Sequence, residues 1–97
     1  MEKEYLVTFK ATTAALRAKL VVDETPTLEH ELKETAEVVP VPFGLSATCF
    51  GMGLKCRTTD EGIQGLYDCL TENKVDFKNF WLVGKEYTPF NQRLERK

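Results

Sequence analysis

The sequence predicts an α+β domain, because strand-like and helix-like segments alternate along its 97 residues in the order β-α-α-β-β-α-β. Runs rich in β-branched and aromatic residues mark the strands, and apolar residues spaced three and four apart mark the helices. Two β-α-β halves of this length commonly form one antiparallel sheet with both helices on the same face, and the right-handed crossover rule favours that arrangement. We therefore expect a ferredoxin-like β-α-β-β-α-β plait with a four-stranded antiparallel sheet.

The chain begins with a strand followed by a helix. Residues 5–9 are β-branched or aromatic at most positions, which is typical of a strand. Thr12 or Thr13 is expected to cap the helix, because a threonine side chain can accept a hydrogen bond from the first turn. Leu16 and Leu20 then fall on one side at i,i+4 spacing among alanines, which is typical of a helix.

Pro26 interrupts the helical pattern. Proline is tolerated in the first turn of a helix, so Pro26 suits the start of a second helical piece. Residues 12–35 are therefore either two short helices or one helix kinked near Pro26, and we expect two.

The second half of the chain supplies three strands and the strongest helix. Residues 37–41 suit an edge strand, where a proline costs no ladder hydrogen bond, and residues 49–57 and 75–83 are the other expected strands. Thr58 and Glu61 match a capping box at the start of a helix. The helix is expected to face the sheet through an apolar stripe formed by Ile63, Leu66, Tyr67 and Leu70.

Length and charge limit the classes of function. Residues 1–84 are expected to form a single domain and residues 85–97 a polar C-terminal tail. The net charge of −2 offers no electrostatic reason for binding nucleic acid or an anionic membrane. The N-terminus lacks the pattern of a signal peptide, and no apolar run reaches the length of a bilayer, so we expect a cytoplasmic protein.

The cysteine pattern argues against disulfides and metal binding. Cys49, Cys56 and Cys69 are an odd number and form no Cys-x-x-Cys pair, and His30 is the only histidine. We expect reduced thiols, no metal and no cofactor. Cys56 and Cys69 border apolar positions and are expected to be structural, and His30 lies among charged residues and is expected at the surface.

The segment 40–54 carries the strongest functional signal. Its Pro-x-Pro motif restricts the backbone and leads it into a turn, and Cys49 follows where the loop is expected to become a strand. Gly51 and Gly53 have no side chains, so one face of that strand is left bare at these positions. The free space either accommodates a ligand or lets a neighbouring strand come close. Cys49 is the candidate reactive thiol. The residues expected to bind around it are Pro42, Ser46, Thr48 and Gly51.

The same segment resembles a family of small bacterial domains described as selenium/sulfur carrier-like proteins. The resemblance rests on Pro40-Val41-Pro42, on Leu45-Ser46-Ala47-Thr48-Cys49 and on Phe9-Lys10-Ala11-Thr12-Thr13. The chain departs from the family pattern at Phe43, where members usually carry arginine, and at Phe50, where they tend to carry glycine. The resemblance implies that Cys49 accepts sulfur or selenium from a donor protein and passes it to an acceptor protein.

A second function class stays open from the residues alone. A cysteine beside aromatic residues is often a buried, inert packing residue. Cys49 would then be structural, and the domain would be a non-catalytic binding or self-association module that uses the open face of its sheet. We expect a homodimer, because small sheets often cover their unpaired edges by pairing. No base, metal set or phosphate loop accompanies the thiol, so a carrier or binding protein is favoured over a complete enzyme.

Overall fold

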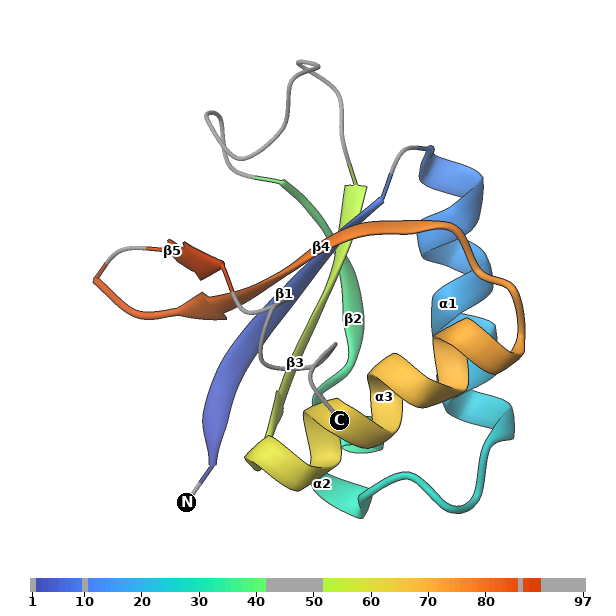
Figure 1. Ribbon diagram of the computed structural model, residues 1–97, viewed down its shortest axis with the longest axis horizontal. Helices are drawn as coiled ribbons and strands as arrows, with labels where there is room; N and C mark the ends of the chain where they lie inside the picture. Colours follow the sequence, from blue (N-terminus) through green and yellow to red (C-terminus); the bar gives the residue numbers. More distant parts are fainter. Residues whose placement is uncertain (1, 10, 42–51, 86, 90–97) are drawn as a thin grey trace.

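The computed structural model confirms an α+β domain built on one antiparallel sheet (Figure 1). The structure describes residues 2–9, 11–41, 52–85 and 87–89. Within these ranges the sheet has five strands in the order β2-β3-β1-β4-β5. Their bounds are Lys3–Phe9 for β1, Glu37–Pro40 for β2, Met52–Thr58 for β3, Phe77–Val83 for β4 and Tyr87–Pro89 for β5.

The fifth strand corrects the expectation of a four-stranded sheet. β5 lies inside the segment 85–97, which we expected to be a polar tail, and it pairs antiparallel with β4 so that Thr88 lies opposite Leu82. The strand is only three residues long, and all three of its residues are exposed. A short polar strand of this kind carries no hydrophobic alternation, which is why the sequence pattern does not reveal it.

β1 is the central strand and is buried on both faces. Tyr5, Val7 and Phe9 point into the main core, whereas Leu6 and Thr8 point to the opposite face of the sheet and are also buried. β1 pairs antiparallel with β3 on one side and with β4 on the other. This double burial explains the uninterrupted apolar and β-branched composition of residues 5–9.

Three helices in the described ranges cover one face of the sheet (Figure 1). They are α1 (Thr12–Glu24), α2 (His30–Thr35) and α3 (Asp60–Glu72). Residues 12–35 thus form two separate helices, as expected. Pro26, however, lies in the turn before α2 and not in its first turn.

α1 departs from the expected packing. Its N-cap is Ala11, which provides no side-chain cap, and the helix buries Ala15, Ala18 and Val22. Leu16 and Leu20 face outward and are 52% and 58% exposed. The leucine spacing thus indicates the helix but not its buried side, because small side chains let α1 sit close to the sheet.

α3 confirms the predicted apolar stripe. Ile63, Leu66 and Leu70 are completely buried and Tyr67 packs against them at the edge. The predicted cap is displaced by one residue, because Thr59 accepts the hydrogen bond from the Gly62 backbone N–H at 3.1 Å. Thr58 instead ends β3.

The hydroxyl of Thr58 is used in a tertiary contact. It donates to Glu29 Oε1 at 2.6 Å, and Thr59 Oγ1 lies 2.9 and 3.0 Å from the two oxygens of the same carboxylate. Glu29 belongs to the connection between α1 and α2. The carboxylate therefore ties that connection to the positively polarised N-terminus of α3.

β4 has an irregular alternation, because Phe77 and Phe80 are an odd number of residues apart. A register shift opposite Thr8 and Phe9 inserts an extra residue in β4, so that both Phe77 and Phe80 reach the core. Their rings meet edge to face with centroids 5.1 Å apart, and Tyr67 lies 5.4 and 5.6 Å from them. A β-bulge thus accounts for the impure pattern.

Candidate functional site

The predicted thiol site lies outside the described residues. This applies to Cys49 and to the expected binding residues around it, Pro42, Ser46, Thr48 and Gly51. The two strands that flank this segment are described. Val39 pairs with Gly53 and Pro40 with Met52, so the segment connects two neighbouring antiparallel strands at one end of the sheet.

Gly53 lies in β3, and its surroundings decide between the two roles left open for it. A Cβ added there would lie 2.7 Å from the Val7 carbonyl oxygen and 3.0 and 3.1 Å from carbons of Leu6 and Val41. These distances are shorter than van der Waals contact. Gly53 therefore lets neighbouring side chains close over β3, and the space is not left for a ligand.

The two described cysteines are structural, as the sequence indicated. Cys56 is 1% exposed, and burial raises the pKa of its thiol to about 12. Cys69 is 7% exposed, and its sulfur lies 3.3 Å from Thr25 Oγ1 and 3.7 Å from Asn73 Nδ2. A thiol buried in the core is out of reach of solvent, so neither cysteine is placed for exchange with solvent reagents.

The face of the sheet opposite the helices carries the best-formed candidate site. In antiparallel pairs, directly opposite residues share a face. Leu6 lies opposite Lys55 on β3 and Trp81 on β4, and Trp81 lies opposite Pro89 on β5. A second row on the same face is centred on Glu4 of β1, which lies opposite Arg57 on β3 and opposite Val83 on β4. Val83 in turn lies opposite Tyr87 on β5. We call this surface the open face.

Trp81 is held in place on the open face. Its Nε1–H donates to Thr8 Oγ1 at 3.3 Å, and the Thr8 hydroxyl donates to the Asn79 carbonyl at 3.3 Å. Both polar atoms are thereby satisfied although Thr8 is buried. The ring is the only tryptophan of the chain and is partly exposed.

A small groove crosses the open face. It has a volume of about 190 Å³ and lies between the edge strand β2 and the β4–β5 hairpin. Leu6, Val39 and Val83 provide apolar lining, and Tyr87 adds an aromatic ring. The full lining is Glu4, Leu6, Val39, Pro40, Lys55, Val83 and Tyr87.

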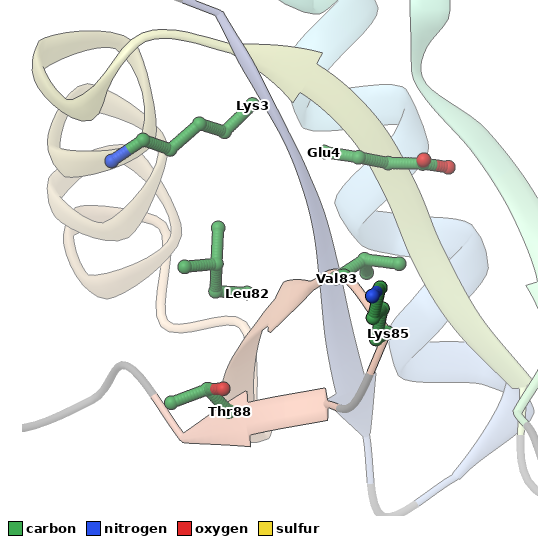
Figure 2. A pocket seen from close by; sticks show the side chains of 7 residues that line it. Lys3, Glu4, Leu82, Val83, Lys85 and Thr88 are labelled. Atoms are coloured by element: carbon green, nitrogen blue, oxygen red, sulfur yellow. The ribbon is translucent and has the colours of Figure 1, made fainter.

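A larger cavity adjoins this groove where β1 begins and β4 turns into β5. Its volume is about 610 Å³, and its lining is Lys3, Glu4, Leu82, Val83, Gly84, Lys85 and Thr88. Figure 2 shows Lys3, Leu82 and Thr88 on the side of β1 toward α3, with Glu4, Val83 and Lys85 on the other side. The open-face groove and this end cavity share Glu4 and Val83, so they are adjacent.

The charges around the two cavities are mainly positive. Lys55 Nζ lies 2.7 Å from Glu4 Oε1, and Lys3 Nζ lies 3.6 Å from Asp60 Oδ1. Lys85 lines the end cavity and is exposed. The combined lining has three lysines and one glutamate, although the whole chain carries a net charge of −2.

Other candidates from the sequence have structural roles. Asp60 opens α3 and accepts a hydrogen bond from the buried Tyr5 hydroxyl at 2.6 Å, as expected of a helix-start residue. His30 is at the surface, 2.9 Å from Glu34. Within the described part of the chain, His, Cys, Asp and Glu side chains form no group of three that could hold a metal ion.

The described helices lack the length and apolar composition needed to span a bilayer. Sequence reasoning had named the open sheet face as a binding surface but had not located the groove or the end cavity.

Comparison of the chain with protein-family models, with curated proteins and with solved structures gives no match. The resemblance to selenium/sulfur carrier-like proteins therefore stays a prediction.

Proposed function

We propose that this domain is a non-catalytic binding module that takes a small amphipathic anion, such as an aromatic or aliphatic carboxylate, on its open face. The observation that carries this proposal is the exposed Lys85 at the end cavity, beside apolar side chains that line both adjoining cavities. Ligand sites typically combine an apolar lining with a few convergent polar groups, and pockets of about 300–1,000 Å³ are usual. The end cavity is of that size, and the smaller groove extends it across the sheet.

The lining residues suggest how such a ligand would lie. Its apolar part would cover the half-buried Val39 and Val83 beside the Tyr87 ring, where burial of apolar surface is favourable. Its anionic group would lie near Lys85 in the end cavity. Lys55 is already neutralised by Glu4, so it contributes less. Charge-assisted hydrogen bonds to the anion would fix the orientation.

Fluorescence of Trp81 provides the test, because this single tryptophan lies on the open face next to Leu6. The protein would be titrated with aromatic and aliphatic carboxylates and with the neutral amides of the same shape. We expect saturable changes with the carboxylates and dissociation constants at least about tenfold weaker for the amides, since a charge-assisted hydrogen bond contributes roughly 1.5–3 kcal/mol.

Two lysine variants provide the matched control. Lys85→Gln should weaken carboxylate binding to about the level of the amides. Lys78→Gln changes an exposed lysine of β4 that lines neither cavity, and it should leave binding unchanged. Equal binding of carboxylates and amides, or equal effects of the two variants, would contradict the proposal.

A thiol carrier that acts through Cys49 is the second candidate. The sequence of residues 40–49 supports it, because Cys49 follows the Pro-x-Pro motif, and the burial of Cys56 and Cys69 makes those two thiols poor carriers. In such a step the Cys49 thiolate attacks the outer sulfur of a donor persulfide, forms a protein persulfide and releases the donor thiol. No external oxidant is needed.

Persulfide labelling followed by mass spectrometry tests the carrier. The folded protein should carry the added sulfur on Cys49, and a Cys49→Ser variant should keep its fold and lose the label. Labelling of all three cysteines only after unfolding would assign Cys49 to packing and leave the binding module as the function.

We further propose that the fold is a ferredoxin-like plait extended by one edge strand. The strand order β2-β3-β1-β4 and the antiparallel pairing of β1 with both β3 and β4 support this assignment. Plaits carry many unrelated functions, so the fold does not choose between the two candidates.

A further inference from the structure

α1 has the reverse of the usual amphipathic arrangement. Surface helices normally place their large apolar residues toward the core. Here the buried residues are Ala15, Ala18 and Val22, while Leu16 and Leu20 are 52% and 58% exposed. They are two of the three large apolar side chains that are exposed in the described part of the chain.

The two leucines form one continuous patch. Residues four apart lie on the same side of a helix, one turn from each other. Leu16 and Leu20 therefore lie side by side on the face of α1 opposite the buried one. Arg17 borders the patch and is held by a hydrogen bond from its guanidinium to the Asn73 carbonyl at 3.2 Å.

The C-terminus of α1 carries charges that the helix dipole disfavours, and its N-terminus lacks the acidic residues that the dipole favours. Its N-terminus has no side-chain cap and no acidic residue in the first turn. Its C-terminus carries Asp23 and Glu24 and has no basic residue in the last turn. Carboxylates stabilise the N-terminal end of a helix and destabilise the C-terminal end. Lys19, at 2.8 Å from Asp23, offsets part of this charge.

We propose that α1 is a self-association surface on which a second copy of this chain packs through its own α1, with the two helices antiparallel. Leu16 of each copy lies against Leu20 of the other. The same register places Thr13 beside Asp23 of the second copy and Thr12 beside Glu24 of the second copy. The acidic C-terminus of each helix thus reaches the uncapped N-terminus of its partner.

Charge complementarity selects a second copy as the occupant. One two-fold arrangement buries both leucines of each copy. It also brings the carboxylates at the C-terminus of each helix to the uncapped N-terminus of the other helix. A two-fold interface uses the same patch twice, so α1 alone provides both halves. Nearly antiparallel helices also pack well through side chains spaced three and four apart. This surface is separate from the open face and does not depend on the proposed ligand.

Sedimentation equilibrium of the full chain from micromolar to millimolar concentration tests association. The wild-type chain should dimerise. The Leu16→Ser/Leu20→Ser double variant should dimerise at least about 100-fold more weakly, because two leucine side chains no longer become buried. Its thermal unfolding should stay close to that of the wild type at concentrations where both chains are monomeric, since both positions are exposed in one copy.

Tyr87→Ser provides the matched control, because Tyr87 is the third exposed large apolar residue and lies on β5. It should leave the dimer intact. A wild-type chain that stays monomeric at millimolar concentration would overturn the proposal. So would a dimer that survives the double leucine variant.

Crosslinking tests the antiparallel geometry. Thr13→Cys and Asp23→Cys chains, each also carrying Cys49→Ser, would be mixed and treated with a short bis-maleimide. We expect efficient crosslinking between the two different chains and little in either chain alone. Efficient crosslinking of Thr13→Cys chains with each other would mean parallel packing and would contradict the inferred register.

Discussion

Replacing Gly62 with alanine should destabilise the fold by about 2 kcal/mol, although alanine is the better helix former by up to about 1 kcal/mol. A Cβ at Gly62 would lie 2.5 Å from Glu29 Oε1 and closer still to Thr58 Oγ1. Those two atoms form the 2.6 Å hydrogen bond that ties the α1–α2 connection to α3. The added methyl group has to break that contact, and a hydrogen bond to a charged group contributes roughly 1.5–3 kcal/mol.

Gly65→Ala is the control in the same helix. Its Cβ would meet only Leu28 Cδ2, at an ordinary distance of 3.7 Å. This variant should gain about 0.5–1 kcal/mol from helix propensity. Urea unfolding should therefore separate the two variants by about 3 kcal/mol, the sum of the loss and the gain. Free energies of unfolding that agree within about 0.5 kcal/mol would refute the account of the Glu29 contact.

Three further outcomes follow from the same structure. Hydrogen bonds from Thr58 and then Thr59 lower the pKa of Glu29 in the folded protein, so the stability that Glu29 contributes is present above its unfolded pKa and is lost as pH falls through its folded pKa. The free energy of unfolding of Glu29→Gln should therefore vary less with pH over that acidic range. A pH profile that matches the wild type would contradict this account. Leu66→Ala should lower the free energy of unfolding by about 2–5 kcal/mol, whereas Leu16→Ala should lower it by under about 0.5 kcal/mol. Similar losses of stability in the two variants would mean that α3 does not cover the sheet. Cys56, with its thiol pKa raised to about 12, should react with a maleimide only on unfolding, and rapid labelling of the native protein would contradict its burial.

Much of the fold was predictable from local patterns. Ile63, Leu66 and Leu70 repeat with the period of a helix, and all three are buried as that pattern indicated. Cys56 borders apolar positions in the sequence and lies in the core, as expected of a structural residue. Such patterns work because the helical and extended backbones each present side chains with a fixed period.

Local patterns failed where a partner element decides the outcome. Leu16 and Leu20 have the spacing of a core stripe, yet alanines occupy the interface because α1 lies close to the sheet. Thr58 has the sequence context of a cap, but the Glu29 carboxylate engages it and Thr59 takes the capping position. The thiol prediction at Cys49 stays a prediction, since that residue lies outside the described ranges.

The sequence by itself determined the class of the fold, the order of most elements and the structural roles of Cys56 and Cys69. Only the tertiary structure decided that β5 joins the sheet and that neighbouring residues pack closely over Gly53. It also decided that the groove and the end cavity adjoin at Glu4 and Val83. The physical reason is that periodicity is set by each residue's own backbone. Cavities, cross-strand rows and charge clusters are set by residues far apart in the chain, whose meeting depends on strand order and register.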